Sequence, residues 1–180
     1  MRIVPMGPSA REILRVDAAT RAAARSVFDA EVGVLASPRV RAIRAWIFET
    51  VPVNAVQKDL AVTLGCRPET LALWFVRASL PSPVRWHHAL VVLRVAAVLR
   101  IPHVTVVDLA RVLGAPSSQG IYRLVASAAG ESWSRWAARV RQDRAHALQQ
   151  FQAMLVKHRE DWRRLDAARW HHRAGIDGLI

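Results

Sequence analysis

The chain has 180 residues, 52% of them hydrophobic, which is enough for one domain with a substantial core or two small domains that share a helix. Its net charge of +12 comes from 24 arginines and 2 lysines against 14 acidic residues. Such an excess favours a polyanionic partner such as nucleic acid over the alternative of a merely solvated basic surface. A single cysteine excludes an internal disulfide and a cysteine-cluster zinc site, and the charged residues that interrupt every apolar run argue against a membrane span. We therefore expect a cytoplasmic protein without a secretion signal.

The first predicted helix begins after Ser9, which forms a capping-box pair with Glu12. Apolar residues then recur at the three-and-four spacing of one helix face: Val16, Ala19, Ala23, Val27, Ala30 and Val34. A second helix is predicted after Ser37, an N-cap followed by proline at the first helical position. Its inner face carries Val40, Ile43 and Ile47, and it ends near Pro52.

The next two predicted helices form a pair around the dipeptide Leu64-Gly65. Asn54 and Gln57 are expected to cap the first helix, and glycine at 65 closes it because glycine readily takes the left-handed conformation. Pro68 opens the second helix, whose core residues are Leu71, Phe75 and Ala78. Ser82-Pro83 then starts a long helix that ends before Pro102 and is apolar on several faces, as expected for a linker helix packed on both sides.

The same frame recurs in Leu109-Ala110 and Leu113-Gly114, 49 positions after Leu60. Thr105 and Asp108 are predicted to cap this helix, and Ser117 or Ser118 to cap the one after the turn. The second helix of the pair is closed by Gly130, and its predicted inner residues are Ile121, Leu124, Val125 and Ala128. Two such pairs in tandem are typical of two helix-turn-helix units.

From Ser132 we predict one helix of about forty residues, because no proline or glycine follows until Gly175. It carries an apolar stripe, with His158 at one polar position, formed by Leu148, Phe151, Leu155, Trp162 and Leu165. Such a stripe is too long for a compact seven-helix body to cover, so we expect it to pack against a second copy, a partner protein or the opening helix. No segment is rich in strand-forming residues, and the predicted fold class is all-α.

With this arrangement, residues 38–136 resemble the DNA-binding domain of the AraC/XylS family of bacterial transcription regulators, in which a linker helix joins two helix-turn-helix units. The matching positions are Leu64-Gly65, Leu71, Phe75, Trp86, Val98-Leu99, Leu109-Ala110 and Leu113-Gly114. The sequence departs from the family at Leu80, Val91 and Ala115, where the family has a glycine, an arginine and an aromatic residue. The resemblance implies a DNA-binding domain at 38–136 between helical extensions at 1–37 and 137–180.

The charge follows the same division. Residues 38–136 hold 12 basic and 5 acidic side chains, a net charge of +7. Residues 1–37 hold 5 basic and 4 acidic side chains, and residues 137–180 hold 9 and 5. Most of the positive excess therefore lies in the segment that resembles a DNA-binding domain.

In the second recognition helix, an inward Ile121 places Gln119 and Arg123 on the opposite face. The resemblance implies that these two residues and Ser118 contact bases, and arginine and glutamine are suited to guanine and adenine edges in the major groove. The corresponding positions of the first recognition helix are Glu69, Ala72 and Leu73, and Val76 lies beside them. That face is mostly apolar, which favours a protein contact over base reading.

Arginines flank the first recognition helix at Arg67 and Arg77. Together with Arg39, Arg41 and Arg44 they are expected either to contact phosphates or to be ordinary solvated arginines.

Two histidine pairs, His87-His88 and His171-His172, have no acidic or cysteine ligand at the usual metal-binding spacing. Cys66 has no histidine or charged triad close to it in the sequence, and no phosphate-binding glycine loop occurs. We therefore expect no metal, no cofactor and no enzymatic activity.

The leading prediction is a sequence-specific regulator of transcription that binds double-stranded DNA, as a homo-oligomer or with a second regulatory protein. The alternative is a protein-interaction module that keeps the helix-turn-helix scaffold and binds another regulator or RNA polymerase. An accessory factor of a nuclease or recombinase is a third possibility.

Overall fold

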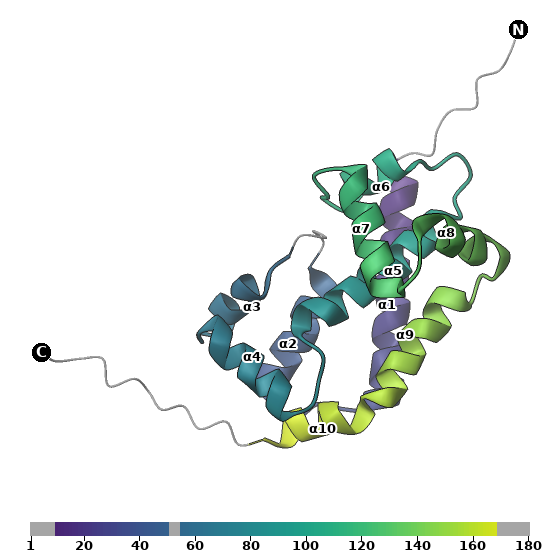
Figure 1. Ribbon diagram of the computed structural model, residues 1–180. Coiled ribbons are helices and arrows are strands. Elements are labelled where there is room, and N and C mark those ends of the chain that lie inside the picture. The colour runs from purple at the N-terminus through teal and green to yellow at the C-terminus, as the bar shows by residue number, and fades with distance from the viewer. Residues whose placement is uncertain (1–9, 51–54, 169–180) are drawn as a thin grey trace, which may run out of the picture.

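The computed structural model describes residues 10–50 and 55–168, and within these ranges the chain forms ten helices and no strand. The all-α prediction is confirmed. The helices are α1 (Ala10–Val32), α2 (Pro38–Glu49), α3 (Gln57–Thr63), α4 (Pro68–Arg77), α5 (Pro83–Val98), α6 (Val106–Val112), α7 (Ser118–Ala129), α8 (Trp133–Gln142), α9 (His146–Lys157) and α10 (Arg159–Ala167). In Figure 1, α5 lies in the middle, with α3 and α4 toward one end and α6 and α7 toward the other.

The buried face of α1 differs from the predicted one. Its buried residues are Ile13, Asp17, Ala24, Phe28 and Val32, whereas Ala19, Ala23 and Ala30 are exposed. Alanine carries little apolar surface, so the larger side chains decide which face of the helix packs on the body. Ser9, the predicted cap of this helix, lies outside the described residues.

The predicted start and inner face of α2 are confirmed. The Ser37 hydroxyl accepts a hydrogen bond from the N–H of Val40 at 3.5 Å, and Pro38 occupies the first helical position. Val40, Ile43 and Ile47 are buried, as their spacing predicted.

Two pairs of neighbouring helices, α3 with α4 and α6 with α7, have the predicted glycine turn. Gly65 and Gly114 both take the left-handed conformation, with φ of 62° and 63°. In this conformation a residue with a side chain is strained, so glycine is required for the chain to leave the first helix of each pair. Each pair packs through its inner residues, including Leu71 and Phe75 in the first and Leu109 and Ile121 in the second.

The start of α3 differs from its prediction. The helix begins at Gln57 after an extended Val56, so Gln57 is the first helical residue and does not occupy the third position of a capping box. Its side-chain amide instead donates to the carbonyl oxygen of Pro68 at 2.9 Å, which ties the start of α3 to the start of α4. Asn54, the predicted cap, lies outside the described residues.

The second pair begins and ends as predicted. The N–H of Asp108 donates to the Thr105 hydroxyl, and the N–H of Thr105 donates to the Asp108 carboxylate, which completes a capping box. Ser117 caps α7 by accepting from the N–H of Gly120, and Gly130 closes α7 with φ of 70°. Ala128 is exposed, although its spacing placed it on the inner face.

Helix α5 is the centre of the core. It packs against α1, α2, α7 and α9, and most of its residues from Leu90 to Val98 are buried. A helix that is apolar on all sides needs neighbours on all sides, which explains the continuous apolar sequence of this segment.

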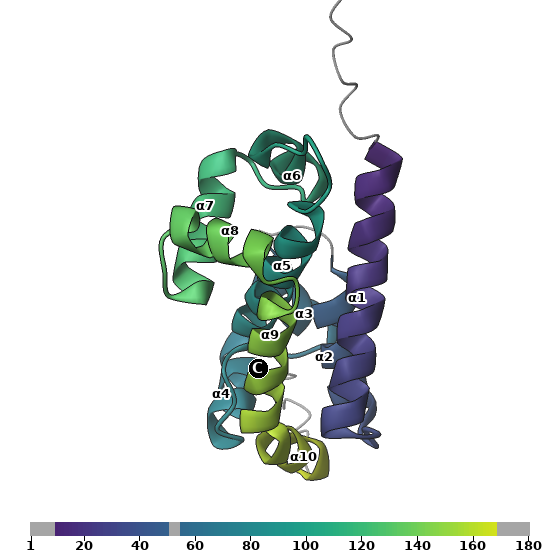
Figure 2. The ribbon, with the colours of Figure 1, turned by 90° about the vertical axis from the view of Figure 1, so that its right-hand side faces the viewer.

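The predicted forty-residue C-terminal helix is wrong, because the chain breaks twice. At Asp143 the backbone is extended, and the carboxylate accepts a hydrogen bond from the N–H of Ala145 at 2.8 Å. A second break occurs at His158, whose ring Nδ1 lies 2.9 Å from the Asp161 carboxylate. A straight helix of that length would extend about 60 Å, whereas the breaks fold α9 and α10 back onto the body (Figure 2).

The apolar stripe is consequently buried within the chain. Phe151, Leu155, Trp162 and Leu165 are buried and Leu148 is half-buried, with α9 and α10 packed against α1. The expectation that these five residues form a surface for a partner or a second copy is therefore corrected: the opening helix, together with α5, covers them.

Candidate nucleic-acid interface

The outer face of α7 carries the residues predicted to read bases. Ile121 and Val125 point into the core, where α7 packs against α5 and α6. Gln119 and Arg123 are consequently exposed, and Ser118 at the start of the helix is half-buried. Gln119 and Arg123 are four residues apart, so their side chains lie one above the other on the same face.

Arg123 is available for an intermolecular contact. No carboxylate of the described residues forms an ion pair with it. A guanidinium can donate two parallel hydrogen bonds to the O6 and N7 atoms of guanine, and a glutamine amide can pair with adenine in the same groove. The face of α7 thus has the donors and the acceptor that reading of base edges requires.

The equivalent face of the first pair, on α3 and α4, is apolar. Leu73 is 44% exposed and Val76 is 70% exposed, and Val62 of α3 is 72% exposed. Ala72 is half-buried and Glu69 is exposed in the first turn of α4. Apart from Glu69, the predicted recognition positions of α4 are Ala72, Leu73 and Val76, which offer apolar groups and no hydrogen-bonding side chain.

The three arginines of α2, which were expected either to contact phosphates or to be solvated, each contact another group within the chain. Arg39 lies over the ring of Trp74 at 5.4 Å. Arg41 donates to the carbonyl oxygens of Leu35 and Ala36, and Arg44 forms an ion pair with Asp29. A guanidinium held by such contacts has fewer donors left for a phosphate.

Arg67 and Arg77, by contrast, are exposed at the two ends of α4. Neither forms an ion pair with a carboxylate in the part of the chain that the structure describes. Of the five arginines near the first pair, these two are therefore the ones for which the described residues show no contact within the chain.

The histidines and the cysteine are explained by packing. His87 is buried, with Nδ1 3.4 Å from the carbonyl oxygen of Ile47 and its ring against Trp46. Burial lowers the pKa of the neighbouring His88. Burial raises the pKa of the Cys66 thiol, and the nearby Arg39 guanidinium opposes that effect. Among residues 10–50 and 55–168, no three metal-ligating side chains lie close enough to hold an ion, and His171 and His172 fall outside these ranges.

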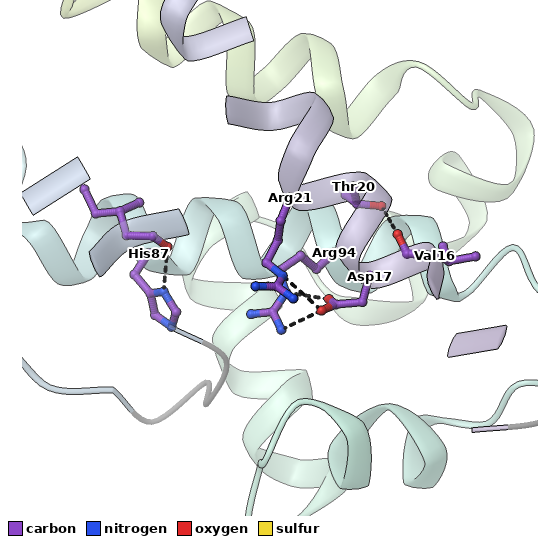
Figure 3. Close-up of polar contacts among 7 residues, drawn as sticks. Val16, Asp17, Thr20, Arg21, His87 and Arg94 are labelled. Atoms are coloured by element: carbon purple, nitrogen blue, oxygen red, sulfur yellow. Dashed lines mark hydrogen bonds and ion pairs between the residues drawn. The ribbon is translucent and has the colours of Figure 1, made fainter. Parts of the chain in front are cut away.

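A buried ion pair that the sequence reasoning missed holds the helix between the two pairs. Figure 3 shows the Asp17 carboxylate of α1 facing the guanidinium groups of Arg94, on α5, and Arg21. The signal was a single charged residue, Arg94, within an otherwise apolar run. Because a buried arginine requires a partner, such a residue predicts a carboxylate elsewhere in the chain, although not which one.

No helix within the described ranges is long and apolar enough to cross a membrane. The chain matches no family model, no curated protein and no solved structure.

Proposed function

We propose that this protein binds double-stranded DNA in a sequence-dependent manner and regulates transcription, with α7 in the major groove. The observation that supports this most directly is the exposed pair Gln119 and Arg123 on one face of α7, with Ser118 beside it at the helix start. Side chains of these types distinguish base pairs by hydrogen bonding in the major groove. The net charge of +12 supplies the attraction to phosphates on which any such complex depends.

The arrangement of helices adds support. In helix-turn-helix proteins a short helix is followed by a tight turn and a second helix, which enters the groove. Helices α6 and α7 have this order, with Gly114 in the left-handed conformation at the turn and an exposed polar face on α7. The resemblance of residues 38–136 to the AraC/XylS DNA-binding domain proposes the same role for α7 and assigns α5 as the linker helix. In this proposal Arg67 and Arg77 contact phosphates at the flanks of α4.

A second candidate function follows from the exposed apolar face on α3 and α4. Val62, Leu73 and Val76 together resemble a small protein-contact patch more than a base-reading surface. In that case the chain is a co-regulator that binds another regulator or RNA polymerase through α4, with or without a DNA contact by α7. Because α9 and α10 are packed within the chain, this face replaces the C-terminal stripe as the proposed site for a second regulatory protein or a second copy.

Selection of duplexes from a pool of random sequences by gel shift tests the first proposal. The full chain is expected to enrich a defined sequence. The logarithm of its binding constant is expected to fall linearly with the logarithm of the salt concentration, with a slope of roughly −0.9 for each phosphate contact. A steep salt dependence without any enriched sequence would leave only non-specific polyanion binding and would favour the co-regulator. An affinity that does not change between low and physiological salt would exclude both forms of DNA binding.

A further inference from the structure

A cleft of about 370 Å³ lies between the loop that follows α5 and the corner that joins α8 to α9. Its polar side chains are Arg100 and His103 on the loop and Arg141 and Arg144 at the corner, and no carboxylate of the described residues lines it. The remainder of the lining is apolar and comes from Leu99, Ile101, Pro102 and Val104. In Figure 2, α8 and α9 run through the middle of the view, between α7 on one side and α1 on the other.

The three arginines of this cleft, like other exposed arginines such as Arg67 and Arg123, form no ion pair within the described residues. No carboxylate in the described part of the chain pairs with Arg100, Arg141 or Arg144. The arginines that do have such a partner are Arg21, Arg25, Arg44, Arg94, Arg139, Arg163 and Arg164. Asp143 is adjacent in sequence, but its carboxylate accepts from the N–H of Ala145 at 2.8 Å and does not line the cleft.

The cleft is held together by a contact between its two sides. Arg100 Nη1 donates to the carbonyl oxygen of Arg144 at 3.3 Å, which ties the loop to the corner and leaves the other N–H groups of Arg100 without a partner that the structure describes. The backbone of His103 takes a left-handed conformation, with φ of 67°, at the turn that forms this side of the cleft. Arg100 also lines an adjoining cleft of about 380 Å³ along α1, whose other charged residue is Arg15.

Several cations that line one space repel one another, and an anion between them removes that repulsion. A guanidinium donates paired, charge-assisted hydrogen bonds to the oxygen atoms of a phosphate, and this geometry suits arginine better than lysine. The volume of the cleft lies within the range of sites for small molecules. The side chains of Arg100, Arg141 and Arg144 are exposed, so their guanidinium groups are accessible to an anion from solvent.

We propose that this cleft, between the α5–α6 loop and the α8–α9 corner, binds a phosphate-type oxyanion through Arg100, Arg141 and Arg144. The site contains no residue of α7 and does not depend on base reading by that helix. A phosphate group can belong to a nucleic-acid backbone or to a small phosphorylated compound. One experiment therefore tests whether the cleft binds phosphate, and a second tests which of these two molecules supplies it.

The site is tested by calorimetric titration of the full chain with inorganic pyrophosphate, at ionic strength held constant with chloride. Saturable binding to one site is expected, and the double variant Arg141→Gln, Arg144→Gln is expected to bind roughly tenfold or more weakly, because two charge-assisted hydrogen-bond donors are lost. The matched control Lys58→Gln, Arg85→Gln removes the same charge from exposed positions on α3 and α5 that do not line the cleft, and should bind like the parent protein. Thermal unfolding verifies that both variants are folded.

Absence of saturable binding overturns the proposal because it shows that the cleft is not a site. Equal weakening in the cleft variant and the control also overturns it, because that result indicates attraction to net charge alone. The source is decided by measuring duplex binding with and without saturating pyrophosphate. Competition assigns the cleft to a DNA phosphate, and an unchanged DNA affinity assigns it to a small phosphorylated compound. The titration contains no DNA, so its result does not depend on whether the protein binds DNA. Likewise, failure of the cleft to bind pyrophosphate would not exclude DNA binding by α7.

Discussion

Arg94 of α5 and Asp17 of α1 form a buried, two-point ion pair, with Nε 2.6 Å from Oδ1 and Nη2 3.2 Å from Oδ2. Both side chains are almost fully removed from solvent, and Arg21 makes a further contact to the same carboxylate. Since two charges lose their hydration on burial, such a pair is stable only when its geometry satisfies both groups. The pair therefore fixes the register of α1 on the central helix.

Removing the carboxylate should be costly. Asp17→Ala leaves the Arg94 guanidinium buried without its counter-charge, and we expect a loss of about 3–5 kcal/mol in the free energy of unfolding, measured by urea denaturation. The control is Glu49→Ala, which breaks the Arg25–Glu49 pair on the surface, where the N–O distance is 3.6 Å, and should change stability by about 1 kcal/mol or less. Equal small effects for the two variants would show that the Asp17 carboxylate is not essential to the core.

The C-terminal stripe leads to a second prediction, centred on Trp162. Its ring is buried against Phe28, Phe75 and Trp86, with ring centroids 5.1 to 6.1 Å away. Trp162→Ala should therefore cost about 3–5 kcal/mol, whereas Val156→Ala, at an exposed position of α9, should cost far less. The measurement is urea unfolding at two protein concentrations.

The dependence on concentration separates packing within the chain from packing between copies. If the stripe is covered within one chain, the cost of Trp162→Ala is the same at both concentrations. A cost that grows with protein concentration would mean that Trp162 is buried between subunits.

The elements from α2 to α7 could be predicted because their signals are local. Ser-Pro starts at Ser37 and Ser82, and glycine ends at Gly65 and Gly114, depend only on the conformations that adjacent residues allow. The predicted exposure of Gln119 and Arg123 followed from the burial of Ile121, which is two residues from each and therefore on the opposite face of the helix.

What could not be predicted depends on contacts between distant segments. The break at Asp143 occurs in a segment without proline or glycine, and it is favoured because α9 can then pack on α1 and α5. The buried face of α1 depends on the partner of Asp17, which lies 77 positions away at Arg94. The basic cleft likewise joins residues near 100 to residues near 144, and no local pattern marks it.

A third prediction concerns the capping box of α6. The Thr105 hydroxyl donates to the Asp108 carboxylate at 2.6 Å and the Thr105 N–H donates at 3.0 Å, and these bonds lower the pKa of Asp108 below its ordinary value of 3.8. When the pKa of a carboxyl group is lower in the folded state than in the unfolded state, its ionised form stabilises the fold. This stabilisation is complete above the unfolded-state pKa and is lost as the pH falls through the folded-state pKa. Thr105→Ala should therefore raise the pKa of Asp108 toward 3.8.

Thr105→Ala should also lower the free energy of unfolding by about 1 kcal/mol at neutral pH, as loss of an N-cap does. The share of this loss that depends on ionised Asp108 should disappear in acid. Carboxyl chemical shifts recorded through an acid titration measure the pKa. The control Thr63→Ala removes a hydroxyl that donates to the Asp59 backbone carbonyl, and it should not move the Asp108 titration. An Asp108 pKa that is unchanged in Thr105→Ala would contradict the assigned cause.

The last prediction compares the two recognition helices in one assay. If Arg123 reads a guanine edge, Arg123→Ala should cost about 1–3 kcal/mol of binding free energy and flatten the preference at one base position, and Gln119→Ala should act at an adjacent position. Arg77→Ala serves as the phosphate-contact control: it should weaken all sequences alike and reduce the salt slope by about one. The measurement is duplex selection with each variant, followed by affinities at several salt concentrations.

Leu73→Ala completes the comparison, because Leu73 offers only methyl groups on the exposed face of α4. We expect it to leave the selected sequence unchanged and to weaken self-association or partner binding, measured by sedimentation of the same proteins, since removal of an exposed leucine from an apolar patch mainly affects contacts between proteins. The reverse pattern, in which Leu73→Ala and Glu69→Ala alter the selected sequence while Arg123→Ala does not, would move base reading from α7 to α4.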